Sequence, residues 1–325
     1  MILLTGATGL VGRQVAELLG ARGTPITAMV RDEARASWLT GLGARLVTDP
    51  ITSADTWHAV REVTAIVHCA AIIAGGRSWE SYAAANIRTT ELAARRAREL
   101  GVPLVQVSSV AVYGGSTTEP VGTVGEEFPF RPLADGAWYA RSKRESEAAV
   151  WREAERGLQA IALRPCVIYG PHDRLFLPKL VRQARRGWMP LIGAGDRPMA
   201  LVHARSVGEA VLAALDSKTG WGRPYNVTGD APIAPRDVVA ALGRGIGRRV
   251  RTPRLPEGAT LTLARGLDSV AGLMMPKGLF PGSLTTAVGY WRGGDPYRSD
   301  AIRRELGWRP ILDHGIEIER AARNV

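Results

Sequence analysis

The stretch Thr5-Gly6-Ala7-Thr8-Gly9-Leu10-Val11-Gly12 follows directly after the apolar run Met1-Ile2-Leu3-Leu4 and precedes a helical pattern over residues 13–19. A strand therefore enters a glycine-spaced turn that leads into a helix. Gly6 permits a tight turn, Gly9 lets backbone N–H groups approach a ligand, and Gly12 lets the helix pack on the strand. The N-terminus of such a helix attracts anions. The stretch predicts a site for the pyrophosphate of a dinucleotide, although glycine-rich turns also end ordinary strands.

The composition is that of a globular protein, since 46% of the 325 residues are hydrophobic and 22% are charged. This length suits one large domain, with or without an appended lobe. The two cysteines, Cys69 and Cys166, have no spacing that suits a disulfide framework or a metal site. We therefore expect that the protein binds no metal and is located in a reducing cytoplasm. We expect no signal peptide and no membrane span, because no apolar run approaches the roughly 18 residues that a span requires.

The net charge of +11 raises the question of an anionic partner. Only four of the 42 basic residues are lysine, and the arginines are scattered, with local density only at 182–186 and 244–254. We favour a solvated, arginine-rich surface over a nucleic-acid or membrane-surface role, because net charge reports on solubility more than on function. Some positive potential near the cofactor would still help to bind a phosphorylated dinucleotide.

Strand-like and helix-like runs alternate in the first half of the chain. Strands are expected at 26–30, 45–47, 65–69, 104–107 and 160–163, and amphipathic helices at 56–62, 82–100 and 139–156. Strands separated by helices of this length predict an α/β fold, with a Rossmann-type doubly wound parallel sheet and right-handed crossovers.

The character of the chain changes after residue 170, where Pro, Gly and Arg become frequent. Residues 171–200 combine helix and loop, whereas a strand at 199–202, a helix at 207–215 and a strand at 225–227 return to the sheet pattern. We expect a Rossmann domain formed by residues 1–170 plus about 199–229. A small, mostly helical substrate-binding lobe would comprise about 171–198 plus 230–325.

The helical stretch at 139–156 contains a candidate proton donor. The spacing of four residues places Tyr139 and Lys143 on one face. An unperturbed tyrosine has a pKa of about 10, and a nearby ammonium lowers it. The phenol could then exchange a proton with a substrate oxygen while hydride moves at the carbon. An isolated pair of this kind is more often part of a solvated face, but the glycine turn favours the catalytic interpretation.

A serine follows the strand expected at 104–107. Residues at the carboxyl end of a parallel strand face the ligand crevice, so Ser109 could orient a substrate oxygen against Tyr139. Turn capping is the common alternative for such a serine. His68 lies within an apolar run, so we expect a buried, hydrogen-bonded histidine rather than a catalytic base.

These features together resemble the extended short-chain dehydrogenase/reductase superfamily, over nearly the whole chain. The glycine turn is similar to its TGxxGxxG motif and residues 108–114 to its SSxxVYG motif. Residues 67–71, 164–171 and 303–310 resemble its fourth-strand, RPxxVYGP and RRELGWxP motifs. Residues 86–90 resemble its Asn-x-x-Gly-Thr helix, with Thr89 in place of the glycine.

The resemblance implies roles for individual residues. Ser109, Tyr139 and Lys143 would be catalytic, with Lys143 also holding the nicotinamide ribose and Asn86 near the proton relay. The residues expected at the cofactor are Gly6, Thr8, Gly9, Leu10, Val11, Gly12, Arg31, Asp49, Pro50, Cys69, Ala70, Ala71, Asn86, Val107, Tyr139, Lys143, Pro165 and Val167.

The end of the second strand indicates which dinucleotide binds. Members that prefer NAD carry an acidic residue there, which binds the ribose hydroxyls. Here Val30 occupies that position and Arg31 follows. An apolar residue does not repel a 2′-phosphate, and a guanidinium can bind one. We predict NADP(H), while Asp32 could still reach the ribose, which keeps NAD(H) open.

The substrate is expected to be a hydrophobic ketone or secondary alcohol. Sugar-nucleotide enzymes of the superfamily carry an arginine before the Ile/Val-His, where this chain has Met199-Ala200-Leu201-Val202-His203, with Arg197 nearby. Residues 169–195 look closer to the 3β-hydroxysteroid dehydrogenase-like and 2-alkyl-3-oxoalkanoate reductase-like branch. Ordinary packing is the alternative for each of the pocket candidates, which are Ile73, Trp79, Phe176, Trp188, Met189 and residues near Met274 and Met275.

The predicted activity is therefore NADP(H)-dependent carbonyl reduction with Tyr139 as general acid/base. A sugar-nucleotide epimerase or dehydratase is the nearer alternative, and a non-catalytic NADP-sensing regulator is another. The partners expected are a small-molecule substrate and no nucleic acid. The resemblance also implies that a homodimer could form through the helices at 82–100 and 139–156.

Overall fold

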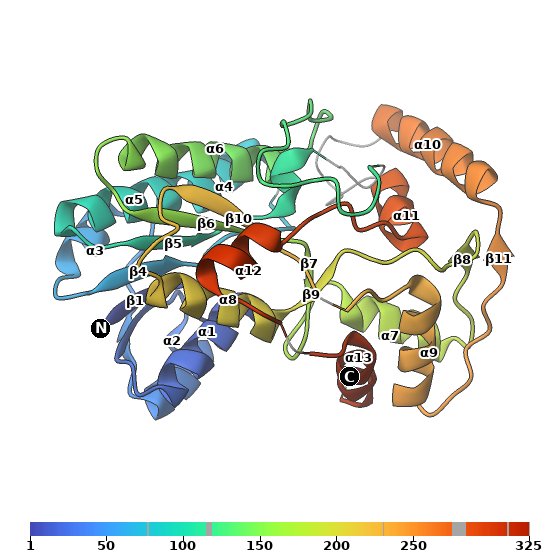
Figure 1. The fold of residues 1–325 in the computed structure, drawn as a ribbon, viewed down its shortest axis with the longest axis horizontal. Helices are drawn as coiled ribbons and strands as arrows, with labels where there is room; N and C mark the ends of the chain where they lie inside the picture. Colours follow the sequence, from blue (N-terminus) through green and yellow to red (C-terminus); the bar gives the residue numbers. More distant parts are fainter. Residues whose placement is uncertain (77, 115–118, 230, 275–283, 311, 325) are drawn as a thin grey trace.

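A seven-stranded parallel sheet forms the centre of the computed structural model (Figure 1), which describes residues 1–76, 78–114, 119–229, 231–274, 284–310 and 312–324. The strand order is β10-β6-β5-β4-β1-β2-β3, and every neighbouring pair is parallel. The predicted Rossmann-type sheet is confirmed. Its strands are β1 (Ile2–Thr5), β2 (Ile26–Met29), β3 (Arg45–Val47), β4 (Ala65–His68), β5 (Leu104–Val107), β6 (Ala160–Pro165) and β10 (Arg223–Val227).

The central strands are buried on both faces, which explains their unbroken apolar sequence. Successive side chains point to opposite sides of a strand. In β1, Ile2 and Leu4 pack in one core cluster, whereas Leu3 between them packs in another. In β4, Val67 joins the first cluster and Ile66 the second. The sheet therefore separates two apolar layers, each covered by helices.

Helices lie on both sides of this sheet (Figure 1). On one side α1 packs against α8, and on the other α5 packs against α6 and α3. The helices that surround the sheet are α1 (Leu10–Ala21), α2 (Glu33–Ala36), α3 (Ala54–Ala59), α4 (Trp79–Tyr82), α5 (Thr89–Leu100), α6 (Trp138–Ala154), α8 (Ala204–Asp216) and α12 (Asp300–Leu306). Short 3₁₀ turns cover Ser37–Leu42 and Val110–Tyr113, and a π-helical turn covers Ala83–Arg88.

A smaller, mostly helical part lies to the right in Figure 1. Its own apolar cluster includes Leu177, Val239 and Ile318, from three different helices. The elements here are α7 (Leu177–Arg185), α9 (Pro235–Gly245), α10 (Glu257–Met274), α11 (Leu284–Arg292), α13 (His314–Arg323) and two pairs of short strands, β7 (Val167–Tyr169) with β9 (Leu201–His203) and β8 (Leu191–Ile192) with β11 (Arg254–Leu255).

One expected strand forms but pairs elsewhere. The strand predicted at 199–202 becomes β9 and pairs with β7, not with the seven-stranded sheet. The cause is a change of partner next to Pro165. The N–H of Cys166 still donates to the Val227 carbonyl at 3.2 Å, whereas the N–H of Val167 donates to Ala200 at 3.2 Å.

The C-terminal segment returns to the sheet. Tyr297, Ile302 and Trp308 pack in the same core cluster as β1, although they follow the helices of the smaller part. The two-domain division at the predicted boundaries stays a prediction. Among the described residues, no helix is both long and apolar enough to span a bilayer, and no cluster of side chains could hold a metal ion.

Candidate active site

The glycine turn lies where the strand order reverses, because β1 has β2 on one side and β4 on the other. Ligands of doubly wound sheets bind at such a point. Gly6 has a φ of +70°, and a Cβ there would lie 2.7 Å from the Ala70 backbone nitrogen. A Cβ on Gly12 would lie 2.2 Å from the Gly6 carbonyl oxygen. Both positions therefore exclude any side chain, and the turn is held closely against the segment after β4.

The start of α1 is open to a ligand. Gly9 occupies the N-cap and supplies no side-chain acceptor for the first helical N–H groups. Thr8 and Gly9 are exposed, and the Gly9 N–H donates to the Gly6 carbonyl at 2.9 Å. The uncapped N–H groups and the positive end of the helix suit a pyrophosphate. The cradle thus fits the dinucleotide that the sequence predicts.

Two polar side chains join β1 to β4 beneath this turn. Thr5 Oγ1 is hydrogen-bonded to His68 Nδ1 at 2.9 Å and accepts the Ala70 N–H at 3.2 Å. Burial lowers the pKa of His68 to about 3, and Lys143 lowers it further. His68 is a neutral structural residue at physiological pH, as predicted. This role of Thr5 was not predicted, although a hydroxyl at the end of an apolar strand was a signal for it.

The three candidate catalytic residues come from the end of β5 and the first two turns of α6. The hydroxyls of Ser109 and Tyr139 lie close enough to interact. Ser109 Oγ also accepts the Ala111 N–H at 3.2 Å, which holds the serine in place. Lys143 Nζ donates to the Val107 carbonyl at 2.8 Å, and an ammonium has three donors in all. This leaves Lys143 able to bind ribose hydroxyls.

The protonation states of this group follow from burial. Desolvation raises the pKa of Tyr139 to about 12, and the Ser109 hydrogen bond opposes that rise. Desolvation lowers the pKa of Lys143 to about 8, while the charges of Glu147 and Cys69 oppose that fall. The sequence predicted that Lys143 would lower the pKa of Tyr139; burial raises it instead, because desolvation penalises the phenolate, and the opposing contribution comes from Ser109. Tyr139 is therefore protonated near neutrality and is suited to donate a proton.

A buried ion pair joins α6, the helix that carries Tyr139 and Lys143, to the sheet. Glu147 lies one turn after Lys143 and pairs with Arg164 of β6 at 2.7 Å, with both side chains at most 4% exposed. The Ser108 hydroxyl donates to the same carboxylate, and Arg164 also donates to the Tyr113 hydroxyl at 2.9 Å. The sequence analysis missed this network. The four-residue spacing of Tyr139, Lys143 and Glu147 was a signal for it.

Asn86 connects α6 to the loop after β4. Its side-chain amide donates to the Ser142 hydroxyl at 2.8 Å and to the Ile72 carbonyl at 3.0 Å, and its side-chain oxygen accepts the Ile72 N–H at 2.8 Å. Asn86 lies within the π-helical turn, whose extra residue turns this side chain inward. Asn86 thus positions the segment that carries Cys69, Ala70 and Ala71.

The remaining cofactor candidates differ in exposure. Arg31, Asp49 and Pro50 are exposed at the ends of β2 and β3, whereas Val107 and Pro165 are buried at the ends of β5 and β6. Half-buried positions are occupied by Leu10, Cys69, Ala70, Ala71 and Val167, and Val11 is buried in α1.

The pocket candidates are dispersed. Trp79 stacks on the Arg141 guanidinium, 4.0 Å from the ring centroid to the Arg141 Cζ, and Ile73 is exposed. Met189 is buried, and Phe176 packs against the same lobe cluster. Trp188 is 47% exposed and forms an isolated bridge with Arg251, so it does not line an enclosed pocket. Met275 and the side chain of Met274 lie outside the described residues.

Two groups that were not predicted from the sequence lie close to the candidate site, Tyr290 near Tyr139 and Asp295 near Cys166. Burial raises the pKa of Tyr290 to about 12, with Cys166 and Tyr139 adding to the rise. Burial also raises the pKa of Asp295 to about 7, and its carboxylate accepts the Tyr297 N–H at 3.2 Å. Both residues are half-buried; Tyr290 lies in α11 and Asp295 follows that helix. No local pattern marks them, because only the fold brings residues 290–295 back to the sheet.

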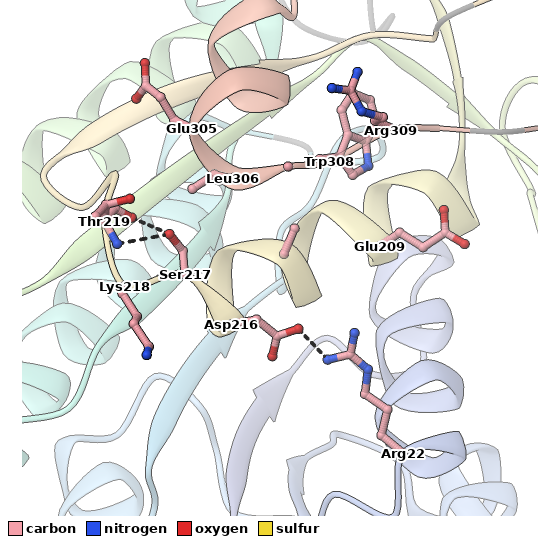
Figure 2. Close-up of a pocket in the computed structure, with 12 residues that line it drawn as sticks. Arg22, Glu209, Asp216, Ser217, Lys218, Thr219, Glu305, Leu306, Trp308 and Arg309 are labelled. Carbon is pink, nitrogen blue, oxygen red and sulfur yellow. Dashed lines mark hydrogen bonds and ion pairs between the residues drawn. The ribbon is translucent and has the colours of Figure 1, made fainter.

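A separate hollow of about 580 Å³ opens at the other end of the strands. Figure 2 shows Arg22 and Asp216, from the ends of α1 and α8, joined by an ion pair of 2.7 Å. The hollow is also lined by Ser217, Lys218 and Thr219, before the start of β10. Its place at the amino ends of the strands separates it from the glycine turn.

A comparison of this sequence with known protein families agrees with the order of the motifs and with their position at one edge of the sheet. Residues 2–228 match the NAD dependent epimerase/dehydratase family. The chain belongs to this family. Members of the epimerase/dehydratase family use a nicotinamide dinucleotide, so the chain is an NAD(P)-dependent enzyme acting on CH–OH groups.

Relatives and neighbours within this family differ in their substrates. The chain is 28% identical to a 4-hydroxy-2-methyl-3-oxo-4-farnesyl-3,4-dihydroquinoline-1-oxide ketoreductase of Stigmatella aurantiaca, over 98% of this chain and 95% of the relative. It is 27% identical to a 2-alkyl-3-oxoalkanoate reductase of Stenotrophomonas maltophilia, over 85% and 83% of the two chains. The structure of UDP-glucuronic acid 4-epimerase from Bacillus cereus in complex with NAD has a TM-score of 0.75 at 17% identity, covering 98% and 96%. That last likeness concerns the fold.

Proposed function

We propose that the chain is an NADP(H)-dependent ketoreductase that interconverts a hydrophobic ketone and a secondary alcohol. The observation that carries the proposal is the proximity of the Ser109 and Tyr139 hydroxyls at the carboxyl edge of the sheet, with the phenol protonated near neutrality. A protonated donor at this position favours carbonyl reduction over alcohol oxidation. The two relatives named above, a ketoreductase and a 2-alkyl-3-oxoalkanoate reductase, support this reaction class.

In the proposed reaction Tyr139 donates its proton to the carbonyl oxygen of the substrate. The dinucleotide, when bound, supplies the hydride that adds to the carbonyl carbon. Ser109 holds the oxygen against Tyr139 through its hydroxyl, which Ala111 keeps in position. The charged Lys143 stabilises the phenolate that proton donation leaves behind and holds the ribose. One hydride and one proton added to a ketone yield the secondary alcohol.

The preference for NADP(H) rests on the residues at the end of β2. Arg31 is exposed, so its guanidinium can approach a 2′-phosphate. Asp32, which could bind ribose hydroxyls instead, caps α2 by accepting the Arg35 N–H at 3.2 Å and pairs with the Arg35 guanidinium at 3.4 Å. These contacts occupy the carboxylate and reduce its repulsion of a phosphate.

The preference for a ketone over a sugar nucleotide rests on two arginines of the smaller part. Arg197 and Arg292 could bind a diphosphate, but both pair with Glu257, at 3.1 and 3.0 Å. Their charge is therefore partly neutralised before any substrate arrives. A neutral, hydrophobic substrate requires no such cations.

The test is a turnover screen with purified protein, in which NADPH or NADH is combined with a panel of hydrophobic ketones and, separately, with UDP-sugars. We expect net oxidation of NADPH with ketones. We expect Arg31→Ala to raise the KM for NADPH by about tenfold, the effect of losing one charge-assisted contact, with little change for NADH. Arg45→Ala, an exposed arginine on the edge strand β3, is the matched control. Interconversion of UDP-sugars without net nicotinamide turnover would refute the ketoreductase, and a preference that survives Arg31→Ala would refute the phosphate partner.

A further inference from the structure

Helix α10 leaves its apolar face in solvent. Leu263 is 64% exposed and Leu267 is 49% exposed, and a spacing of four places them on one side of the helix. Ala259, one turn earlier, is exposed as well. A surface helix normally turns its apolar stripe toward the core. In α10 these two leucines point into solvent instead, and the exposure of their apolar surface to water is unfavourable.

Two more exposed apolar side chains lie on or beside the segment that leads into α10. Trp188, bridged to Arg251, is 47% exposed, and Leu255 of β11 is 38% exposed. β11 leads directly into α10 along the right-hand edge of the molecule (Figure 1). We call Trp188, Leu255, Leu263 and Leu267 together with the adjoining arginines the basic apolar edge. Clustered exposed apolar side chains of this kind mark interaction sites.

The charge along this edge is positive. Arg249, Arg251 and Arg254 lie exposed in the segment before α10, and Arg265 is exposed within it. Among the described residues, none of these four arginines forms an ion pair with a carboxylate. The acidic residues of α10 face inward, since Glu257 pairs with Arg197 and Arg292, and Asp268 accepts the N–H groups of Leu284 and Thr285.

We propose that the basic apolar edge docks on the surface of an anionic lipid bilayer. An apolar helix stripe lies in the interfacial region of such a bilayer, and flanking arginines bind its anionic headgroups. A second copy of this chain would bring its own arginines against these, and nucleic acid would not use the leucines. The edge is separate from the glycine turn and Tyr139, so this inference does not depend on the reaction proposed above.

The experiment is co-sedimentation of the full-length protein with vesicles of phosphatidylcholine alone or with about one third phosphatidylglycerol. The first variant, Leu263→Glu with Leu267→Glu, removes the stripe, and Ile316→Glu, at a residue 59% exposed on α13, is its control. The second variant, Arg249→Glu with Arg251→Glu, reverses the charge, and its control is Arg45→Glu with Arg61→Glu, two exposed arginines near the opposite edge of the sheet. Circular dichroism and NADPH affinity establish that each variant is folded.

We expect binding to the anionic vesicles at low salt and little to the neutral ones. The arginine variant should bind at least about 25-fold more weakly, from about fivefold for each charge removed. The leucine variant should lose at least about tenfold, and both controls should keep their binding. Absence of vesicle binding, or equal losses in the controls, would overturn the proposal. A leucine variant that binds vesicles normally but changes from dimer to monomer would assign the edge to a second copy. Retention of DNA instead of vesicles would assign it to nucleic acid.

Discussion

Helices α6 and α10 use the same four-residue spacing for opposite purposes. In α6 the spacing places Tyr139, Lys143 and Glu147 on the face that packs toward β5 and β6, where Lys143 reaches Val107 and Glu147 reaches Arg164. In α10 the spacing places Leu263 and Leu267 on the face that points into solvent.

Helical periodicity alone therefore does not reveal which face of a helix is buried. The difference comes from what lies behind each helix. α6 covers a sheet, so polar groups on its inner face are desolvated and their pKa values shift. α10 packs mainly against α11, so its outer leucines stay in water. Substitutions on the inner face of α6 should therefore change chemistry and stability, and those at Leu263 and Leu267 of α10 should change neither.

The largest effect is expected at Tyr139. Tyr139→Phe removes the proton donor and keeps the ring, so kcat for ketone reduction should fall by about 10²–10⁴-fold. The measurement is NADPH oxidation under saturating substrate. Tyr82→Phe is the control, because the Tyr82 hydroxyl donates at a long distance, 3.4 Å, to the Ile73 carbonyl. A Tyr139→Phe enzyme that retains more than a third of the wild-type kcat would contradict the assigned role.

The second effect concerns the ion pair beneath the site. Glu147→Gln leaves the buried Arg164 charge without its partner and should lower the free energy of unfolding by about 3 kcal/mol. The control is Glu145→Gln on the same helix, where the exposed pair with Arg141 at 2.8 Å should contribute less than about 1 kcal/mol. Urea unfolding followed by circular dichroism gives both values. Equal losses in the two variants would show that burial is not decisive.

The third effect is a pH dependence set by Lys143. Its pKa of about 8 lies below the ordinary value because burial disfavours the ammonium. Lys143 is therefore charged below pH 8 and neutral above it, so kcat for reduction should be constant below about pH 7 and fall above pH 8, toward about tenfold per pH unit. Lys143→Arg should remove that fall, because a guanidinium does not deprotonate in this range. A wild-type profile that stays flat to pH 10 would contradict the role of the charge.

The smallest effect compares the two helices directly. Val150 of α6 is fully buried, so Val150→Ala should lower the free energy of unfolding by about 2 kcal/mol. Leu263→Ala on α10 removes more atoms but should change stability by less than about 0.5 kcal/mol, because the leucine is already exposed. Thermal or urea unfolding of both variants measures the difference. A larger loss for Leu263→Ala would show that α10 is covered in solution, for example by a second copy.

Local patterns in the sequence were sufficient for the sheet and for the start of the site. Apolar runs of strand length that alternate with helices indicate parallel strands, because each helix returns the chain to the end of the sheet where the previous strand began. Gly6 and Gly12 are sequence signals because their neighbours exclude a Cβ. The placement of Tyr139 and Lys143 on one face of α6 follows from one helical turn, and the chain matches its family over residues 2–228.

Contacts between distant segments decided the rest. No short sequence pattern relates the residues that these contacts join. Examples are the backbone bonds of Cys166 and Val167 to different strands, the ion pair of Glu147 with Arg164, and the proximity of Tyr290 to Tyr139. The pKa values of Tyr139 and Lys143 depend on desolvation, which exists only after the chain has packed around them. The order of apolar runs and glycines along the chain was enough to predict the sheet and the glycine turn, since both depend on neighbours in the sequence, and it also singled out Tyr139 as the candidate proton donor. Only the tertiary structure decided the protonation states and the exposed face of α10, because burial is a property of the whole fold.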